Sequence, residues 1–207
     1  MAVSILASNK EIMTRARESL RNNWKVPVIV TLVYLVIVAM SGQSEALNLA
    51  FSLILGGPIA LGFAFFYLGG VREQRFDSAV FGQAFQQFLN AMLTYILVGL
   101  LVLLWSLLLI IPGVLAALSY SLTFYVMHDE PQLHTLQAIG RSKELMYGHR
   151  WQLFCLGLRF LAWSLLALLT LGIGFLWLLP YFQTAMAHFY EEVLNSHHLA
   201  QPELIAE

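Results

Sequence analysis

The sequence is poor in cysteine and in charge. Cys155 is the single cysteine of the 207 residues, which excludes an intrachain disulfide and any Cys-x-x-Cys metal or redox motif. We expect its thiol to pack as a small hydrophobic group. Charged residues make up 11% of the chain and hydrophobic residues 59%, whereas a soluble domain is about one quarter charged. The apolar excess gathers in long runs, and this pattern is typical of a membrane protein.

Motifs of enzymes and of metal centres are also missing. The sequence contains no nucleophile elbow, phosphate-binding loop, dinucleotide fingerprint or paired intramembrane carboxylates. The six histidines show no His-x-x-x-His or His-Glu-x-x-His spacing, so we expect no metal site and no cofactor. Intramembrane hydrolases and proton carriers usually hold acids inside their spans, and the apolar runs hold none. We therefore expect a protein without enzymatic activity and without a nucleic-acid partner.

Six apolar segments are candidates for membrane spans. A helix needs about 20 residues to cross a hydrocarbon core of about 30 Å, and the second, third and fifth segments reach that length. The other three are shorter, so we predict six crossings and keep four crossings with one re-entrant pair as the alternative. Whether the fourth and the sixth segment cross completely is left open. The segments are 24–40, 47–68, 90–111, 114–127, 151–171 and 173–190.

The lysines and arginines predict the orientation. Ten of the eleven lie before the first segment, between the second and third, or between the fourth and fifth. The connectors on the other side, 41–46, 112–113 and the one around Gly172, carry none. Because cytoplasmic loops retain Lys and Arg, we expect both termini to be cytoplasmic and the chain to lie in the cytoplasmic (inner) membrane. No cleavage-site pattern follows the polar first 24 residues, so the first segment should remain as an anchor.

The chain, taken as one integral membrane domain of residues 1–207, appears to repeat one unit three times. Each unit is expected to contain a cytoplasmic amphipathic helix, a span, a tight turn and a return span. A Phe-Tyr dipeptide closes every return span, at 66–67, 124–125 and 189–190. The alternative is that these tyrosines only mark the membrane interface. The predicted units are 9–70, 76–128 and 131–191.

Local signals predict the ends of the helices. Ser8 and Glu11 have the spacing of a capping box, Asp77 can cap the second amphipathic helix, and Pro131 suits the first turn of the third. Such helices would lie in the interface with their apolar faces toward the acyl chains. Gly and Pro predict the outer turns at 56–58, 112–113 and 172–174.

The expected fold class is therefore all-α. We predict a polytopic membrane helical bundle of about six transmembrane helices in three hairpins, with three cytoplasmic interfacial amphipathic helices.

Several stretches of the chain recur in one known family. They are Ile111-Pro-Gly-Val114, Ser119-Tyr-Ser121, Ala138 with Ser142-Lys-Glu144, Met146 with Gly148-His149, Trp151 to Phe154, Leu169-Thr-Leu-Gly-Ile-Gly174, Leu178 with Pro180-Tyr181, and Ala187 with Phe189-Tyr-Glu191. Their ordered set resembles a bacterial membrane protein family known only as domain of unknown function 975, from Gly57 onward and more loosely before it. The resemblance implies a multi-span protein of the bacterial cytoplasmic membrane, and it implies no activity.

Arg159 is the only charged residue well inside a predicted span, about 12 Å beyond Trp151 along the helix. A cation in hydrocarbon is costly, so Arg159 is a candidate for gripping an anionic substrate or a lipid headgroup, with Tyr120 and Tyr181 as hydroxyl partners. The alternative is that its long stem lifts the guanidinium toward the cytoplasm. In the resembling family a small polar residue, commonly Ser, usually stands at this position, which weakens a family-wide role.

Three functional classes follow from these patterns. The preferred one is a non-enzymatic membrane component that assists lipid organisation or a membrane partner complex. The alternative is a transporter or channel for a small molecule or lipid, with a polar cavity near Arg159, and an enzyme comes last. We expect membrane lipids as partners, attracted by the basic residues Arg141, Lys143 and Arg150 with about 1 kcal/mol each. A membrane protein or a second copy of the chain is a further expected partner.

Overall fold

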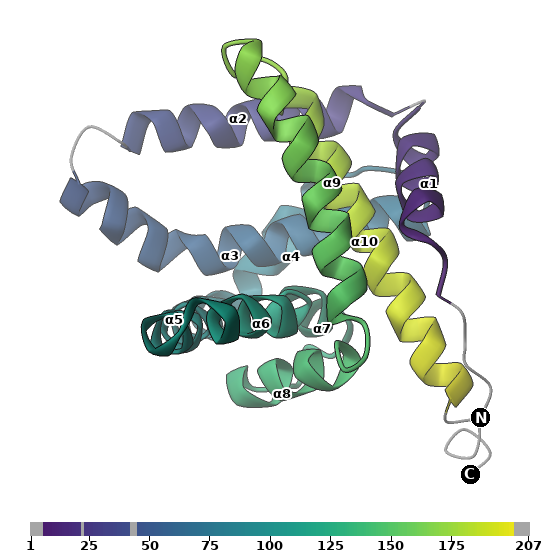
Figure 1. Cartoon of the computed structure of the whole chain (residues 1–207). Helices are drawn as coiled ribbons and strands as arrows, with labels where there is room; N and C mark the ends of the chain where they lie inside the picture. The colour runs from purple at the N-terminus through teal and green to yellow at the C-terminus, as the bar shows by residue number, and fades with distance from the viewer. Residues whose placement is uncertain (1–5, 22, 42–44, 201–207) are drawn as a thin grey trace.

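The computed structural model of the chain describes residues 6–21, 23–41 and 45–200 (Figure 1). These residues form α-helices, two short 3-10 turns and the connections between them, with no strand among them, so the all-α expectation is confirmed. The elements are α1 (Asn9–Arg21), α2 (Lys25–Ser41), α3 (Glu45–Arg72), η1 (Ser78–Val80), α4 (Phe81–Ala84), η2 (Phe85–Gln87), α5 (Phe88–Leu108), α6 (Ile110–Tyr120), α7 (Thr123–Asp129), α8 (Thr135–Leu145), α9 (Arg150–Leu169) and α10 (Phe175–Ala200).

Four helical stretches in the described part of the chain are long and apolar enough to cross a membrane. They are Asn48–Arg72, Ser78–Leu108, Ile110–Asp129 and Arg150–Leu169. α1 and α2 would add a fifth if they formed one span, although they meet at an angle of 97°. α2 alone has only 17 residues. The structure therefore has four to five candidate spans, as a membrane protein requires, and the count of six stays a prediction.

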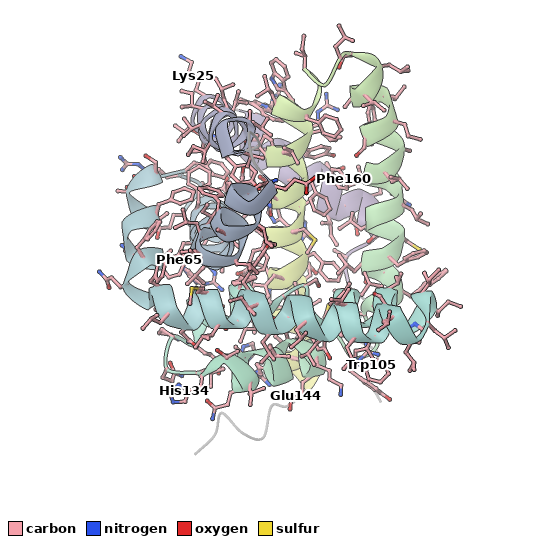
Figure 2. All side chains as sticks on the ribbon, turned by 90° about the vertical axis from the view of Figure 1, so that its left-hand side faces the viewer. Lys25, Phe65, Trp105, His134, Glu144 and Phe160 are labelled. Atoms are coloured by element: carbon pink, nitrogen blue, oxygen red, sulfur yellow. The ribbon has the colours of Figure 1, made fainter. Side chains whose placement is uncertain are left out.

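Three consecutive helix pairs, α2–α3, α5–α6 and α9–α10, leave a shared core in different directions. In Figure 1, α2 and α3 lie across the view, whereas α9 and α10 run up it. Figure 2, turned by 90°, shows α5 with Trp105 lying across the view and α2 and α3 almost end on. The side chains near the α5–α6 turn are correspondingly bare, with Leu107 83% exposed. The three pairs diverge, so they do not form a parallel bundle.

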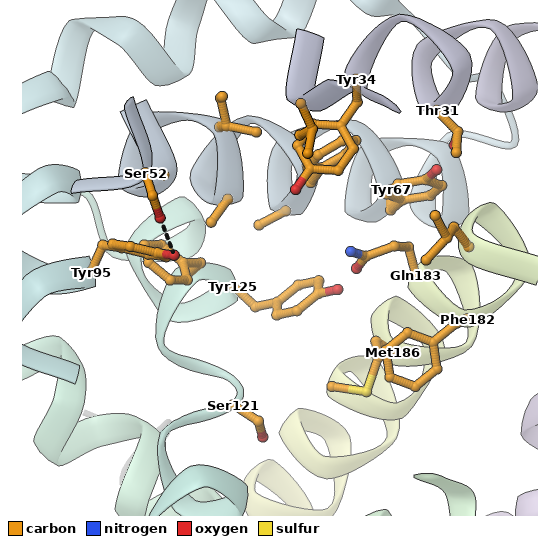
Figure 3. A pocket seen from close by; sticks show the side chains of 18 of the residues that line it. Thr31, Tyr34, Ser52, Tyr67, Tyr95, Ser121, Tyr125, Phe182, Gln183 and Met186 are labelled. Atoms are coloured by element: carbon orange, nitrogen blue, oxygen red, sulfur yellow. Dashed lines mark hydrogen bonds between the residues drawn. The ribbon is translucent and has the colours of Figure 1, made fainter. Parts of the chain in front are cut away.

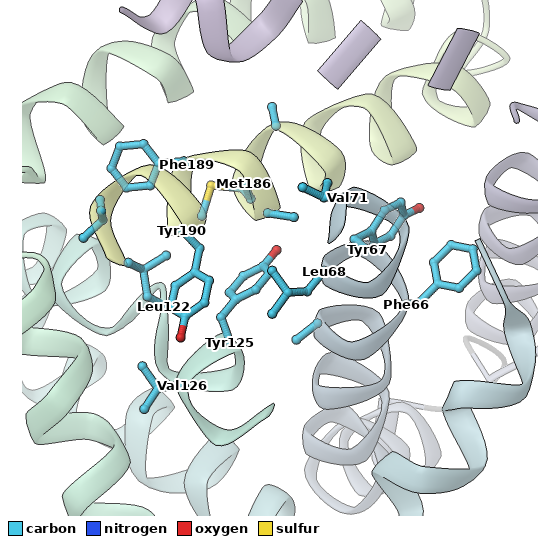
Figure 4. Packing of buried hydrophobic residues seen from close by; sticks show 14 of the residues in the cluster. Phe66, Tyr67, Leu68, Val71, Leu122, Tyr125, Val126, Met186, Phe189 and Tyr190 are labelled. Atoms are coloured by element: carbon cyan, nitrogen blue, oxygen red, sulfur yellow. The ribbon is translucent and has the colours of Figure 1, made fainter. Parts of the chain in front are cut away.

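The core lies where the three pairs meet, and the Phe-Tyr dipeptides form its centre (Figure 4). Phe66, Tyr67, Phe189 and Tyr190 are among the largest fully buried side chains. Tyr125 stacks on Tyr190 with ring centroids 5.4 Å apart. Such aromatic pairs contribute about 0.5–1.5 kcal/mol beyond their buried area. The interpretation that these tyrosines only mark a membrane interface is therefore wrong, because protein atoms surround them.

Two of the three predicted turns lie elsewhere. Residues 56–58 are inside α3, where a Cβ added to Gly57 would lie 2.2 Å from the Ala91 carbonyl oxygen. These glycines let α3 and α5 approach closely and make no turn. The break between α5 and α6 falls at Leu109, whose backbone is extended (φ −161°, ψ 144°), so Pro112 lies in the first turn of α6. The turn at 172–174 is confirmed, with Gly172 at φ +85°. The connector 41–46 falls partly outside the described residues.

The N-terminal helix α1 buries its apolar face inside the protein. Its capping box is confirmed, since the Ser8 N–H donates to Glu11 Oε2 (2.7 Å) and the Glu11 N–H to Ser8 Oγ (3.3 Å). Ile12, Ala16 and Leu20 are fully buried, and α1 packs against α10, α3 and α9. The prediction that this face lies against acyl chains is therefore wrong, because neighbouring helices cover it.

The starts of the second and third amphipathic stretches differ in outcome. Asp77 caps η1 by accepting from the Ala79 N–H at 2.9 Å, as predicted. α8 begins at Thr135, after an N-cap at His134 whose N–H donates to Gln137 Oε1 (3.0 Å). Pro131 therefore lies before the helix and not in its first turn.

Candidate functional site

A cavity of about 600 Å³ lies between α2, α3 and α10, closed at the far side by α5 and by the junction of α6 and α7 (Figure 3). This volume falls within the range of about 300–1,000 Å³ typical of ligand pockets. Apolar side chains such as Phe63, Phe182 and Met186 form much of the wall. The polar lining residues are Thr31, Tyr34, Asn48, Ser52, Tyr67, Tyr95, Ser121, Tyr125 and Gln183.

Small and aromatic residues of α3 shape the walls. Ser52 and Tyr95 hold their hydroxyl oxygens 3.3 Å apart and so connect α3 to α5. Gly56 makes room for the Tyr95 ring, because a Cβ there would lie 2.8 Å from it. Toward α2, the Tyr34 ring meets the Phe63 ring edge to face, with centroids 5.3 Å apart. The cavity lies between these two contacts.

Tyr67 places an unpaired hydroxyl at one end of the cavity. Its side chain is fully buried, and its Oη has no hydrogen-bond partner in the part of the chain that the structure describes. Thr31 lies beside it (Figure 3) but not in hydrogen-bonding geometry. A buried hydroxyl without a partner costs about 1–3 kcal/mol. A molecule in the cavity could supply the missing partner.

The described lining carries no Asp, Glu, Lys, Arg or His. Figure 3 shows Tyr34, Tyr125 and Gln183 pointing into the space from three different helices. Phenol and amide groups both donate and accept hydrogen bonds, whereas they carry no charge at neutral pH. The cavity can therefore hold polar, uncharged groups beside apolar ones.

An ionic cluster joins the roots of the helix pairs next to the cavity. Arg72, at the end of α3, donates from Nη1 and Nη2 to the Asp129 carboxylate of α7 at 2.7 and 2.8 Å. Its Nε donates to Glu191 of α10 at 2.6 Å. Tyr190 Oη donates to the same Asp129 at 2.8 Å. Because Tyr190 stacks on the cavity residue Tyr125, the cluster supports one wall of the cavity.

The residues predicted around Arg159 do not come together. Arg159 is exposed on α9, does not line the cavity, and has no hydrogen-bond or ion-pair partner among the described residues. Tyr181 instead donates its hydroxyl to the Met13 carbonyl of α1 at 3.1 Å. Tyr120 is half-buried at the end of α6, also outside the cavity lining. The predicted polar cavity near Arg159 is thus not the cavity described above.

The basic residues Arg141, Lys143 and Arg150 lie in and after α8. Arg141 pairs with Glu130 and Glu144, each at 3.4 Å, so acids of the chain offset its charge. Lys143 is exposed. Arg150 is half-buried, and its Nε is a buried donor without a partner among the described residues.

Sequence reasoning missed the cavity residues Tyr34, Tyr95 and Gln183, and marked Tyr67 and Tyr125 only as repeat positions. Their shared signal is a polar side chain in an otherwise apolar helix, which predicts a site only once the helices are placed. Across the described residues, no three His, Cys, Asp or Glu side chains gather to hold a metal ion.

Comparison with known families places the chain. The family described as "Protein of unknown function (DUF975)" matches residues 1–119 and 106–197, so the two matches together cover nearly the whole sequence. The chain belongs to this family, as its motifs predicted. No curated protein and no solved structure is significantly similar to it.

Proposed function

We propose that the chain is a non-enzymatic integral protein of the bacterial cytoplasmic membrane that takes up a small amphipathic molecule from the bilayer. The observation that carries the proposal is the cavity between α2, α3 and α10, with its uncharged polar lining and the unpaired Tyr67 hydroxyl. α3 and α5, which contribute to its walls, are candidate spans, so a lipidic molecule would reach the cavity from the membrane. In this role the protein would assist lipid organisation and not convert its ligand.

Retention of a molecule by the purified protein tests this proposal. Ala60 lines the cavity, and Ala60→Phe places a ring in the space. Ala117→Phe adds the same ring at an exposed position on α6 and serves as the control. Native mass spectrometry of gently extracted protein should detect a bound small molecule or lipid in the wild type and in Ala117→Phe. The molecule should be lost from Ala60→Phe. Equal retention by all three proteins would refute binding in this cavity.

We further propose six crossings with both termini in the cytoplasm. The N-terminal end of the described chain meets the last helix, since the Ala7 N–H donates to Glu192 at 3.3 Å, which supports one side for both ends. Single cysteines at Lys10 and Leu199, in a Cys155→Ser background, should resist a membrane-impermeant thiol reagent in intact cells. A cysteine at Leu171, which is 94% exposed in the α9–α10 turn, should react. Reaction at Lys10 or Leu199 in intact cells would overturn this topology.

A further inference from the structure

The chemistry of the cavity restricts the ligand that it can hold. A phosphate or ammonium group moved into this space would leave water without meeting a charge of opposite sign, because the described lining residues are all uncharged. Burying an unpaired charge is among the most costly events in a protein interior. Ordinary phospholipid headgroups therefore do not fit, although their acyl chains would.

The same lining favours a ligand that carries hydroxyl or ester oxygens. Tyr34, Tyr125 and Gln183 point into the cavity, and each can donate and accept. The Tyr67 hydroxyl is fully buried and lacks a partner, so it is available for a ligand oxygen at no cost in protein hydrogen bonds. Next to these groups, the rings of Phe63 and Phe182 offer an apolar surface for hydrocarbon.

We propose that the cavity binds an uncharged lipid with a free hydroxyl, of the diacylglycerol class, whose hydroxyl exchanges a hydrogen bond with Tyr67. The inference rests on the proposed function and adds to it the class of the ligand and the residue that recognises the polar group. It predicts discrimination between two lipids that share their acyl chains and differ only by a phosphate.

Two short-chain probes test this class directly. Dioctanoylglycerol and dioctanoyl phosphatidic acid are titrated into the full-length protein in detergent, and binding is followed by native mass spectrometry and by the shift in the thermal unfolding midpoint. We expect saturable binding of dioctanoylglycerol, and binding of the phosphatidic acid weaker by at least about tenfold. Equal or tighter binding of the phosphatidic acid would overturn the uncharged class and leave the proposed lipid-binding function standing. If neither probe binds and no molecule copurifies, both proposals fail.

Tyr67→Phe isolates the proposed contact. It removes one oxygen that has no partner in the protein, so the unliganded variant should unfold at the same temperature as the wild type or higher. Its affinity for dioctanoylglycerol should fall by about tenfold. Tyr120→Phe removes a hydroxyl outside the cavity and should leave the affinity unchanged. If Tyr67→Phe unfolds at a lower temperature and binds dioctanoylglycerol as tightly as the wild type, the hydroxyl is structural and the assignment of Tyr67 is overturned.

Discussion

The pairs α5–α6 and α2–α3 have the same order of helix, turn and helix, yet one is closed and the other is open. Between α5 and α6, a Cβ on Gly113 would lie 2.7 Å from the Ser106 Cα, so the two backbones already touch. Between α2 and α3, the rings of Tyr34 and Phe63 meet edge to face, and the cavity of about 600 Å³ remains beside them.

The difference shows how residue size decides between packing and a site. A glycine at the crossing lets two helices approach until their backbones touch, whereas two aromatic rings at the same place hold helices apart. An open space inside a protein is destabilising unless something fills it. The open pair is thus the one that needs a ligand, and the closed pair is the scaffold beside it.

The largest expected effect comes from forcing the closed pair open. Gly113→Val would place methyl groups against the Ser106 backbone, and we expect a loss of about 3 kcal/mol of unfolding free energy. Thermal unfolding in detergent, followed by circular dichroism, measures it. Gly99→Val, on the same pair at a position with no atom within 4 Å, should be nearly neutral. Similar losses for both variants would contradict the close contact.

The next effect comes from the ionic cluster that holds the roots of both pairs. Asp129→Asn weakens the bidentate bond from Arg72 and the bond from Tyr190. Because the Arg72 side chain is 35% exposed, solvent screening reduces the loss, which we expect to be about 2 kcal/mol. The exposed Glu73→Gln provides the control, and chemical denaturation compares the two. A stability equal to that of the control would show that the cluster is dispensable.

A smaller effect is expected from removing the contact that holds the open pair apart. Tyr34→Leu deletes the edge-to-face contact with Phe63 and should cost about 1 kcal/mol. It should also reduce the amount of retained lipid, because α2 can then approach α3. Tyr147→Leu, at a side chain 79% exposed, should change neither quantity. Full lipid retention by Tyr34→Leu would mean that the opening does not depend on this contact.

The smallest effect concerns the third pair and its response to pH. Burial lowers the pKa of His149 below its ordinary value, as does the neighbouring His197, whose own pKa burial also lowers. The unfolded chain therefore takes up more protons than the folded one as pH falls below about 6.5, and stability is lost there but not above it. The thermal midpoint should drop between pH 7.5 and 5.5. His149→Gln with His197→Gln should show a shallower drop, and an unchanged slope would exclude this pair as the cause.

Features that depend on a few neighbouring residues could be read from the sequence. Ser8 with Glu11, Asp77 and Gly172 act within one turn of backbone, and all three predictions are confirmed. Gly57 looked like a turn residue because its role depends on Ala91 of another helix, which the local sequence does not contain. The apolar stripe of α1 gave the right face but not what covers it, since protein and lipid are equally apolar covers.

The cavity could not be predicted for the same reason. Its polar lining comes from α2, α3, α5, α10 and the α6–α7 junction, so residues as far apart as Thr31 and Gln183 share one space. Arg159 attracted attention because a charge inside an apolar run is visible in one dimension. Uncharged phenols such as Tyr95 are ordinary in such runs and acquire meaning only through their neighbours.

The divergence of the three helix pairs has a consequence for the surrounding bilayer. Pairs that leave one core in different directions cannot all stand upright in one flat sheet of lipid. A helix of 20 residues such as α9 is about 30 Å long, and when it crosses obliquely it covers less than that along the membrane normal. Lipids beside such helices must shorten their chains by disorder or tilt. The protein would thus sit in a thin spot of its own making, where a lipid has less far to travel from either leaflet.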